Sequence, residues 1–259
     1  MSELIQLEKR DHIAILTIAN PPANTWTAES LEALRETVAS LNADRDIYAL
    51  VVTGQGEKFF SAGADLKAFA DGDVANATRM AQSFGQAFEA LVNFRGVAIA
   101  ALNGYAMGGG LECALACDIR IAEEHVEMAL PEAGVGLLPC AGGTQNLPWL
   151  VGEGWAKRMI LCGERVKADK ALAISLVEEV VPTGEGLDKA LELAESACRQ
   201  SPSAVARCKP LIMSAREGRS HADGWRMERE RFVALFSTED QHEGVNAFLE
   251  KRQPEWKNR

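Results

Sequence analysis

The chain has 259 residues, of which 47% are hydrophobic, and its formal net charge is -10 at pH 7. This length suits one large domain, or a domain with an appendage, around a sizeable buried core. The acidic balance argues against a nucleic-acid surface, which needs clustered lysine and arginine to neutralise phosphates.

The N-terminal residues, the apolar stretches and the cysteines predict the cellular location of the protein. Residues 1–11 carry charges throughout and lack the apolar core of a signal peptide, and no stretch approaches the roughly 18 apolar residues that span a bilayer. We therefore expect a soluble, cytoplasmic protein with no membrane partner. The six cysteines are scattered without the two-residue gap of a zinc or redox motif, so we expect buried free thiols and no metal site.

The first part of the chain predicts two strands, a loop, a helix and another strand. Polar and apolar residues alternate over residues 4–9 and 12–18, which indicates an antiparallel pair of strands. Two prolines in residues 20–27 predict a loop, and apolar residues at helical spacing predict a helix from Ser30. The apolar run at residues 48–53, ended by glycines, predicts a buried strand.

A turn of small residues follows, with the sequence Lys58-Phe-Phe-Ser-Ala-Gly-Ala-Asp-Leu-Lys67. Small side chains leave backbone N–H groups accessible to a ligand, and the two lysines add positive charge. The same pattern is also compatible with an ordinary surface loop. A long helix is predicted over residues 75–94, where apolar residues recur on one face.

The stretch from Asn103 to Asp118 holds the first candidate catalytic group. It follows an apolar strand over residues 97–102, contains the turn Gly108-Gly109-Gly110 and continues as a helix. Unpaired N–H groups and the dipole at a helix start stabilise an oxygen that carries negative charge. Glu112 lies in the first helical turn, so a proton-transfer group is expected beside this anion site.

A second carboxylate is predicted on a rigid loop. A strand is expected over residues 118–122, and Pro131 restricts the backbone directly before Glu132. A glycine-rich run over residues 134–144 follows this loop.

The remainder of the chain is mostly helical in pattern, with one short strand expected over residues 177–181. Helices are expected over residues 153–162, 167–174, 187–200, 202–216, 220–235 and 239–252. We therefore predict an α/β core over residues 1–195 and a helical C-terminal region over residues 196–259. Helices that need apolar partners also favour oligomerisation.

Several kinds of site fit these residues poorly. The four histidines lie far in sequence from both glycine-rich turns, and no G-x-S-x-G elbow is present, which argues against a Ser-His-Asp triad. The triple glycine lacks the Lys-Ser/Thr of a phosphate-binding loop. A nicotinamide-dependent oxidoreductase stays open as an alternative, although the glycines lack G-x-G-x-x-G spacing.

Two turns with backbone donors and two glutamates fit enolate chemistry better. Two converging N–H groups stabilise the oxyanion of an enolate, and carboxyl groups beside it move protons to and from carbon or water.

The combined motifs resemble the crotonase superfamily, and most closely an enoyl-CoA hydratase. The resemblance extends over essentially the whole chain in the family's order and spacing, and it rests on Phe60-Ser-Ala-Gly-Ala-Asp-Leu-Lys67, Asn103-Gly-Tyr-Ala-Met-Gly-Gly-Gly-Leu-Glu112, Cys117-Asp118, Leu130-Pro-Glu-Ala-Gly134 and Ala141-Gly-Gly-Thr-Gln145. It implies a spiral of ββα units followed by helices that build homotrimers or homohexamers. It also implies an acyl-CoA substrate, with coenzyme A as part of the substrate and no separate cofactor.

The resemblance also assigns residues. Ala64 and Gly109 match the two amide donors to the thioester carbonyl, whereas Glu112 and Glu132 match the glutamates that activate water and protonate carbon, respectively. The positions that match coenzyme A contacts, some of them across a subunit contact, are Lys58, Ala62, Ala64, Asp65, Leu66, Lys67, Gly109, Phe248 and Lys251.

Departures from the family pattern put the acyl-chain preference in doubt more than the reaction type. They are Cys140, Asn146, Cys113 and the bulky Trp26, in a loop that borders the ligand in relatives. Retention of both glutamates favours a hydratase over an isomerase, because shifting a double bond can use a single proton-handling group. Isomerisation, decarboxylation and non-catalytic coenzyme A binding stay open as alternatives.

Overall fold

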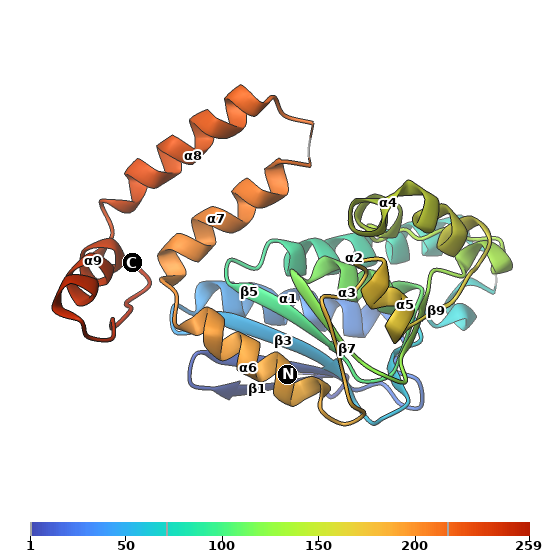
Figure 1. Ribbon diagram of the computed structural model, residues 1–259. Helices are drawn as coiled ribbons and strands as arrows, with labels where there is room; N and C mark the ends of the chain where they lie inside the picture. Colours follow the sequence, from blue (N-terminus) through green and yellow to red (C-terminus); the bar gives the residue numbers. More distant parts are fainter. Residues whose placement is uncertain (1, 71, 217) are drawn as a thin grey trace.

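The computed structural model describes residues 2–70, 72–216 and 218–259. A six-stranded sheet forms its centre, in the order β1-β2-β3-β5-β7-β10 (Figure 1). Its strands are β1 (Ile5–Arg10), β2 (Ile13–Ile18), β3 (Ala49–Gly54), β5 (Val97–Leu102), β7 (Ile119–Glu123) and β10 (Glu179–Val181). β1 and β2 pair antiparallel, whereas the pairs from β2 to β10 are parallel.

The two faces of this sheet are buried against different helices. Ile13 and Ile15 of β2 point to the face covered by α6 (Gly186–Cys198). Ala14 and Leu16 point to the opposite face, where the main core also contains α1 (Ala28–Ala43), α2 (Val74–Val92) and α3 (Gly109–Ala116). Because successive strand residues alternate between faces, a strand buried on both sides is apolar at nearly every position.

A smaller sheet, in the order β4-β6-β8-β9, produces the repeating strand–strand–helix pattern. Its strands are β4 (Phe59–Ser61), β6 (Tyr105–Met107), β8 (Glu127–Ala129) and β9 (Val166–Lys167). The pairs β3/β4, β5/β6 and β7/β8 each place one strand in each sheet before the chain turns into a helix. The glycine-rich turns therefore directly follow strands of the smaller sheet in the chain.

The C-terminal helices extend beyond the sheets. After α4 (Gly143–Leu161) and α5 (Ala168–Ala173), helices α7 (Pro202–Ser214) and α8 (His221–Leu235) form an arm that projects from the core, with α9 (Glu239–Glu250) near its base (Figure 1). Large apolar side chains on α7, α8 and α9 are solvent-exposed, among them Ile212, Trp225, Phe232 and Phe248.

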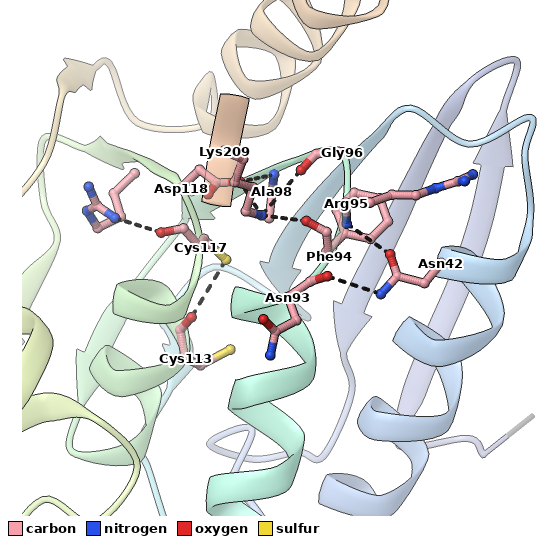
Figure 2. A network of polar contacts seen from close by, with 11 residues as sticks. Asn42, Asn93, Phe94, Arg95, Gly96, Ala98, Cys113, Cys117, Asp118 and Lys209 are labelled. Atoms are coloured by element: carbon pink, nitrogen blue, oxygen red, sulfur yellow. Dashed lines mark hydrogen bonds and ion pairs between the residues drawn. The ribbon is translucent and has the colours of Figure 1, made fainter. Parts of the chain in front are cut away.

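A half-buried ion pair joins the arm to the core. Lys209 of α7 lies 2.8 Å from the Asp118 carboxylate and donates to the carbonyls of Phe94 and Gly96 (Figure 2). Asp118 also accepts the N–H of Ala98 at the start of β5. Asp118 directly follows Cys117, the C-cap of α3, so this network links the arm to the far end of the helix that begins at Gly109.

The structure confirms the α/β class, the initial strand pair, the long helix and the C-terminal helices predicted from the sequence. The prediction missed the three-residue strands of the smaller sheet and the first ten residues of α4, which bends at Gly152. The division at residue 195 stays a prediction, and that residue lies within α6.

All six cysteines are free thiols, but only Cys113 and Cys117 are fully buried, so the expectation of buried thiols was wrong for the other four. Among the described residues, no helix has the length and apolar character that would carry it through a bilayer.

Candidate active site

The Ala64 turn is held from one side by the loop that precedes α1. The Trp26 N–H donates to the Gly63 carbonyl at 2.8 Å, and the Asp65 N–H donates to the Trp26 carbonyl at 3.2 Å. Trp26 and Ala64 thereby form an isolated parallel bridge. In such a bridge the flanking residues face the partner, so the N–H of Ala64 itself points to the opposite side.

The Gly109 turn requires glycine for geometric reasons. Gly108 has φ 54 and ψ -126, a conformation that L side chains rarely adopt. A β-carbon on Gly110 would lie 2.1 Å from the carbonyl oxygen of Ser61, so the two turns approach through their backbones. Gly109 is the first residue of α3, and its N–H therefore has no acceptor within the helix. This amide nitrogen would lie 3.1 Å from a β-carbon on Gly63, which places the two turns side by side.

Glu112 is fixed by amide donors from a distant loop. Its Oε1 accepts the N–H of Ala141 at 2.8 Å and the N–H of Gly143 at 2.9 Å. Gly143 is the first residue of α4, so the carboxyl group also faces the positive end of that helix dipole. Burial raises the pKa of Glu112, whereas the bonds from Gly143 and Ala141 favour its ionised form and oppose that increase.

The carboxyl group of Glu132 is less well hydrogen-bonded than that of Glu112. Glu132 begins the single-turn helix η2 (Glu132–Val135) directly after Pro131, where the sequence predicted a loop. Its Oε2 is buried without a hydrogen-bond partner among the described residues. Burial raises the pKa of Glu132 to about 7, and the negative charge of Glu112 contributes to the increase.

These groups line one cavity of about 360 Å³. Ala64 and Gly109 lie along it together with both carboxyl groups, Glu112 and Glu132. Ala62 and Leu66, two of the predicted ligand contacts, also line it. The remaining wall is largely apolar and includes Phe69, Phe84, Val135, Leu137 and Leu138.

Five predicted contact residues lie outside the lining of this cavity. Lys58 and Lys67 are exposed on either side of the Ala64 turn, and the Asp65 carboxylate caps η1 (Leu66–Phe69) by accepting the Lys67 N–H. Phe248 is 83% exposed on α9, and Lys251 ends that helix with φ 57. Within one chain, the structure therefore does not bring Phe248 and Lys251 into the cavity.

The side chain of Trp26 lies outside the cavity lining. The family resemblance placed the loop that carries Trp26 beside the ligand, but the Trp26 side chain itself is fully buried and does not contribute to the described cavity lining. The structure instead adds Phe84 of α2, which the sequence indicated only as part of an apolar helix face. The amides of Ala141 and Gly143 were also missed, although the glycine-rich run was the available signal.

The arrangement combines two functions that carbanion chemistry needs. Amides at Ala64 and Gly109 can donate to an oxygen on which negative charge develops, and two carboxyl groups of different protonation tendency can transfer protons nearby. Among the described residues, no group of histidine, cysteine, aspartate and glutamate side chains is placed to hold a metal ion.

The chain is similar to known proteins over nearly its whole length. Residues 8–259 match the family described as enoyl-CoA hydratase/isomerase. The 2,3-dehydroadipyl-CoA hydratase of Escherichia coli is 40% identical, with 100% of both chains covered. Among solved structures, Pseudomonas aeruginosa DspI superposes with a TM-score of 0.96 at 66% identity, over 99% of this chain and 97% of that one. An enoyl-CoA hydratase from Bacillus anthracis gives a TM-score of 0.94 at 35% identity, over 99% and 100% of the two chains.

Proposed function

Because the chain belongs to the enoyl-CoA hydratase/isomerase family of enzymes, we propose that it adds water across the double bond of a 2-enoyl-CoA thioester. The observation that carries this proposal is that Glu112, Glu132, Ala64 and Gly109 all line one cavity. The proposed reaction needs neither a metal ion nor a nicotinamide.

The two amides act on the thioester carbonyl. As an oxygen nucleophile adds to the β-carbon, electron density moves through the α-carbon to the carbonyl oxygen, which becomes an enolate oxyanion. The N–H groups of Ala64 and Gly109 donate to this oxygen. Loss of one donor of this kind typically costs about 2.7–4 kcal/mol of transition-state stabilisation.

The two carboxyl groups divide the proton transfers. Glu112, whose Oε1 is held by two amides, accepts a proton from water as the water oxygen bonds to the β-carbon. Glu132, whose pKa is raised to about 7, donates its proton to the α-carbon. The product carries H at the α-carbon and OH at the β-carbon, and transfer of a proton from Glu112 back to Glu132 through solvent restores both groups, so the net reaction is the addition of one water molecule.

The composition of the cavity wall favours a hydrocarbon acyl chain. Apart from the two glutamates and the thiol of Cys140, the lining side chains are apolar, and no lysine, arginine or histidine lies among the described ones. A dehydroadipyl chain ends in a second carboxylate, which would lose its hydration here without a cationic partner. The proposed substrates are therefore uncharged 2-enoyl chains.

Coenzyme A contacts and assembly complete the proposal. Lys58, Asp65 and Lys67 lie along the pantetheine and nucleotide part of the substrate, and Phe248 and Lys251 reach it from a neighbouring subunit. Exposure of large apolar side chains on α7 to α9 supports a homotrimer or homohexamer in which these faces are covered. Sedimentation velocity with the wild-type chain tests the assembly.

The experiment that tests the reaction follows the loss of conjugated thioester absorbance with crotonyl-CoA and longer 2-enoyl-CoA homologues. Mass spectrometry of the product should show the addition of one water. A product of unchanged mass would indicate isomerisation, and binding without turnover would indicate a non-catalytic coenzyme A binder.

A further inference from the structure

Trp26 is hydrogen-bonded to one of the turns that carry the candidate amide donors, and its ring faces the other. Its backbone bonds to Gly63 and Asp65, on either side of Ala64, at 2.8 and 3.2 Å. On the side of the other turn, the ring atom Cδ1 would lie 3.5 Å from a β-carbon on Gly109. The backbone of Trp26 is therefore hydrogen-bonded to the Ala64 turn, and its ring lies on the side of Gly109 where a β-carbon would stand.

The indole ring of Trp26 packs in a cluster of aromatic side chains beside the cavity. It meets Phe88 edge to face at 5.6 Å between centroids, and Phe88 meets Phe84 in the same way at 5.7 Å. Phe84 lines the cavity, and its Cε1 would lie 2.9 Å from a β-carbon on Gly109. Trp26 is fully buried, so a smaller side chain would leave a void directly behind both turns.

The ring contributes volume rather than a hydrogen bond. Its Nε1 is buried and has no partner among the described residues. The contacts that remain are packing contacts, which depend on the size and shape of the indole.

We infer that Trp26 is a positioning residue that sets the spacing between the amides of Ala64 and Gly109. This inference rests on the proposed function, in which both amides donate to one thioester oxygen. Such donors are effective only within about 2.7–3.1 Å of the oxygen. When the ring is truncated, the turns relax toward the void, and the two N–H groups no longer converge on that oxygen.

The test uses a saturated ligand so that its main readout does not require turnover. Hexanoyl-CoA labelled with ¹³C at the thioester carbonyl is bound to the wild type, to Trp26→Leu and to the milder Trp26→Phe, and the carbonyl stretch is recorded by infrared difference spectroscopy. The matched control is Leu41→Ala, a fully buried core position near the other end of α1. Steady-state hydration of crotonyl-CoA is measured in parallel.

The wild type should shift the carbonyl band to lower frequency, and Trp26→Leu should lose at least half of this shift. We expect kcat to fall about tenfold to a hundredfold in Trp26→Leu, less than the full loss of a donor, while KM stays within about threefold. Trp26→Phe should give an intermediate loss, and Leu41→Ala should keep both the shift and kcat despite a lower Tm. An undiminished shift in folded Trp26→Leu, or an equal loss in Leu41→Ala, would overturn the positioning role. A wild type that binds the ligand without any carbonyl shift would overturn the oxyanion site itself.

Discussion

The carboxyl groups of Glu112 and Glu132 line the same cavity but are held in opposite ways. Oε1 of Glu112 accepts two backbone N–H groups at 2.8 and 2.9 Å, whereas Oε2 of Glu132 is buried with no partner among the described residues. Donors favour the ionised form of a carboxyl group, and burial without donors favours the protonated form. Burial raises the pKa of both groups, but amide donors oppose the increase at Glu112, whereas Oε2 of Glu132 has no partner among the described residues.

This difference predicts a bell-shaped pH profile for kcat/KM. Activity should fall above about pH 7 as Glu132 loses its proton, because the pKa of this group is raised to about 7 by burial. It should also fall on the acidic side as Glu112 becomes protonated. Initial rates with crotonyl-CoA between pH 4 and 10 check this prediction, and a rate that stays constant to pH 9 would contradict it.

The same pKa has a consequence for stability. Between pH 4.5 and about 7 the folded chain keeps a proton on Glu132 that the unfolded chain releases, so the free energy of unfolding falls as pH rises through this window. The Glu132→Gln variant has no titrating carboxyl group at this position, so its free energy of unfolding lacks this decrease. At pH 8 the variant should be more stable than the wild type by about 1–3 kcal/mol, with little difference at pH 4. Urea unfolding at both pH values provides the measurement, and an equal difference at both would count against it.

Gly143 offers a test of the Glu112 anchor. A β-carbon at this position would lie 3.0 Å from Glu112 Oε1 and 2.8 Å from Pro139 Cβ, so Gly143→Ala should displace the carboxylate. We expect kcat to fall by about tenfold or more, within the range that general acid–base groups contribute. Gly154→Ala on the same helix is the control, since nothing lies within 4 Å of its β-carbon. Equal activity of the two variants would contradict the proposal that the fixed position of the Glu112 carboxylate matters for catalysis.

The ion pair between arm and core should contribute to stability. Lys209→Met leaves Asp118, whose side chain is only 26% exposed, without its cation. We expect a loss of about 1–3 kcal/mol in the free energy of unfolding, because the half-buried carboxylate of Asp118 is left without a compensating charge. Lys157→Met breaks an exposed pair with Glu153 and should cost less than about 0.5 kcal/mol. Denaturant titrations of the two variants should differ accordingly, and similar losses would show that the Lys209 pair has no special weight.

The sequence was sufficient for elements with a strong repeated pattern. The strand Val97–Leu102 has the predicted bounds because a continuous apolar run marks it, and α2 differs from its predicted range by one or two residues because a long helical periodicity marks it. The strand Tyr105–Met107 is too short for any periodicity to show. The first part of α4 was missed because its glycines and Pro148 resemble a loop pattern.

The site was predictable where chemistry and turn geometry coincide in the sequence. Glu112 and Glu132 stood out because each lies beside a constrained turn. The amides that hold Glu112 come from residues 29 and 31 positions later in the chain, and only the tertiary fold shows that contact. The burial of Trp26 depends likewise on how α2 packs against the two turns, which no local pattern encodes.

The most direct test of the proposed reaction is the hydration of crotonyl-CoA by Glu132→Gln. Glutamine keeps the shape of the side chain but cannot supply the proton to the α-carbon. We expect the Kd for hexanoyl-CoA to stay within about threefold and kcat to fall by roughly a hundredfold to ten-thousandfold. Glu124→Gln, on an exposed loop outside the cavity, should keep full activity. Wild-type turnover in Glu132→Gln would contradict the account.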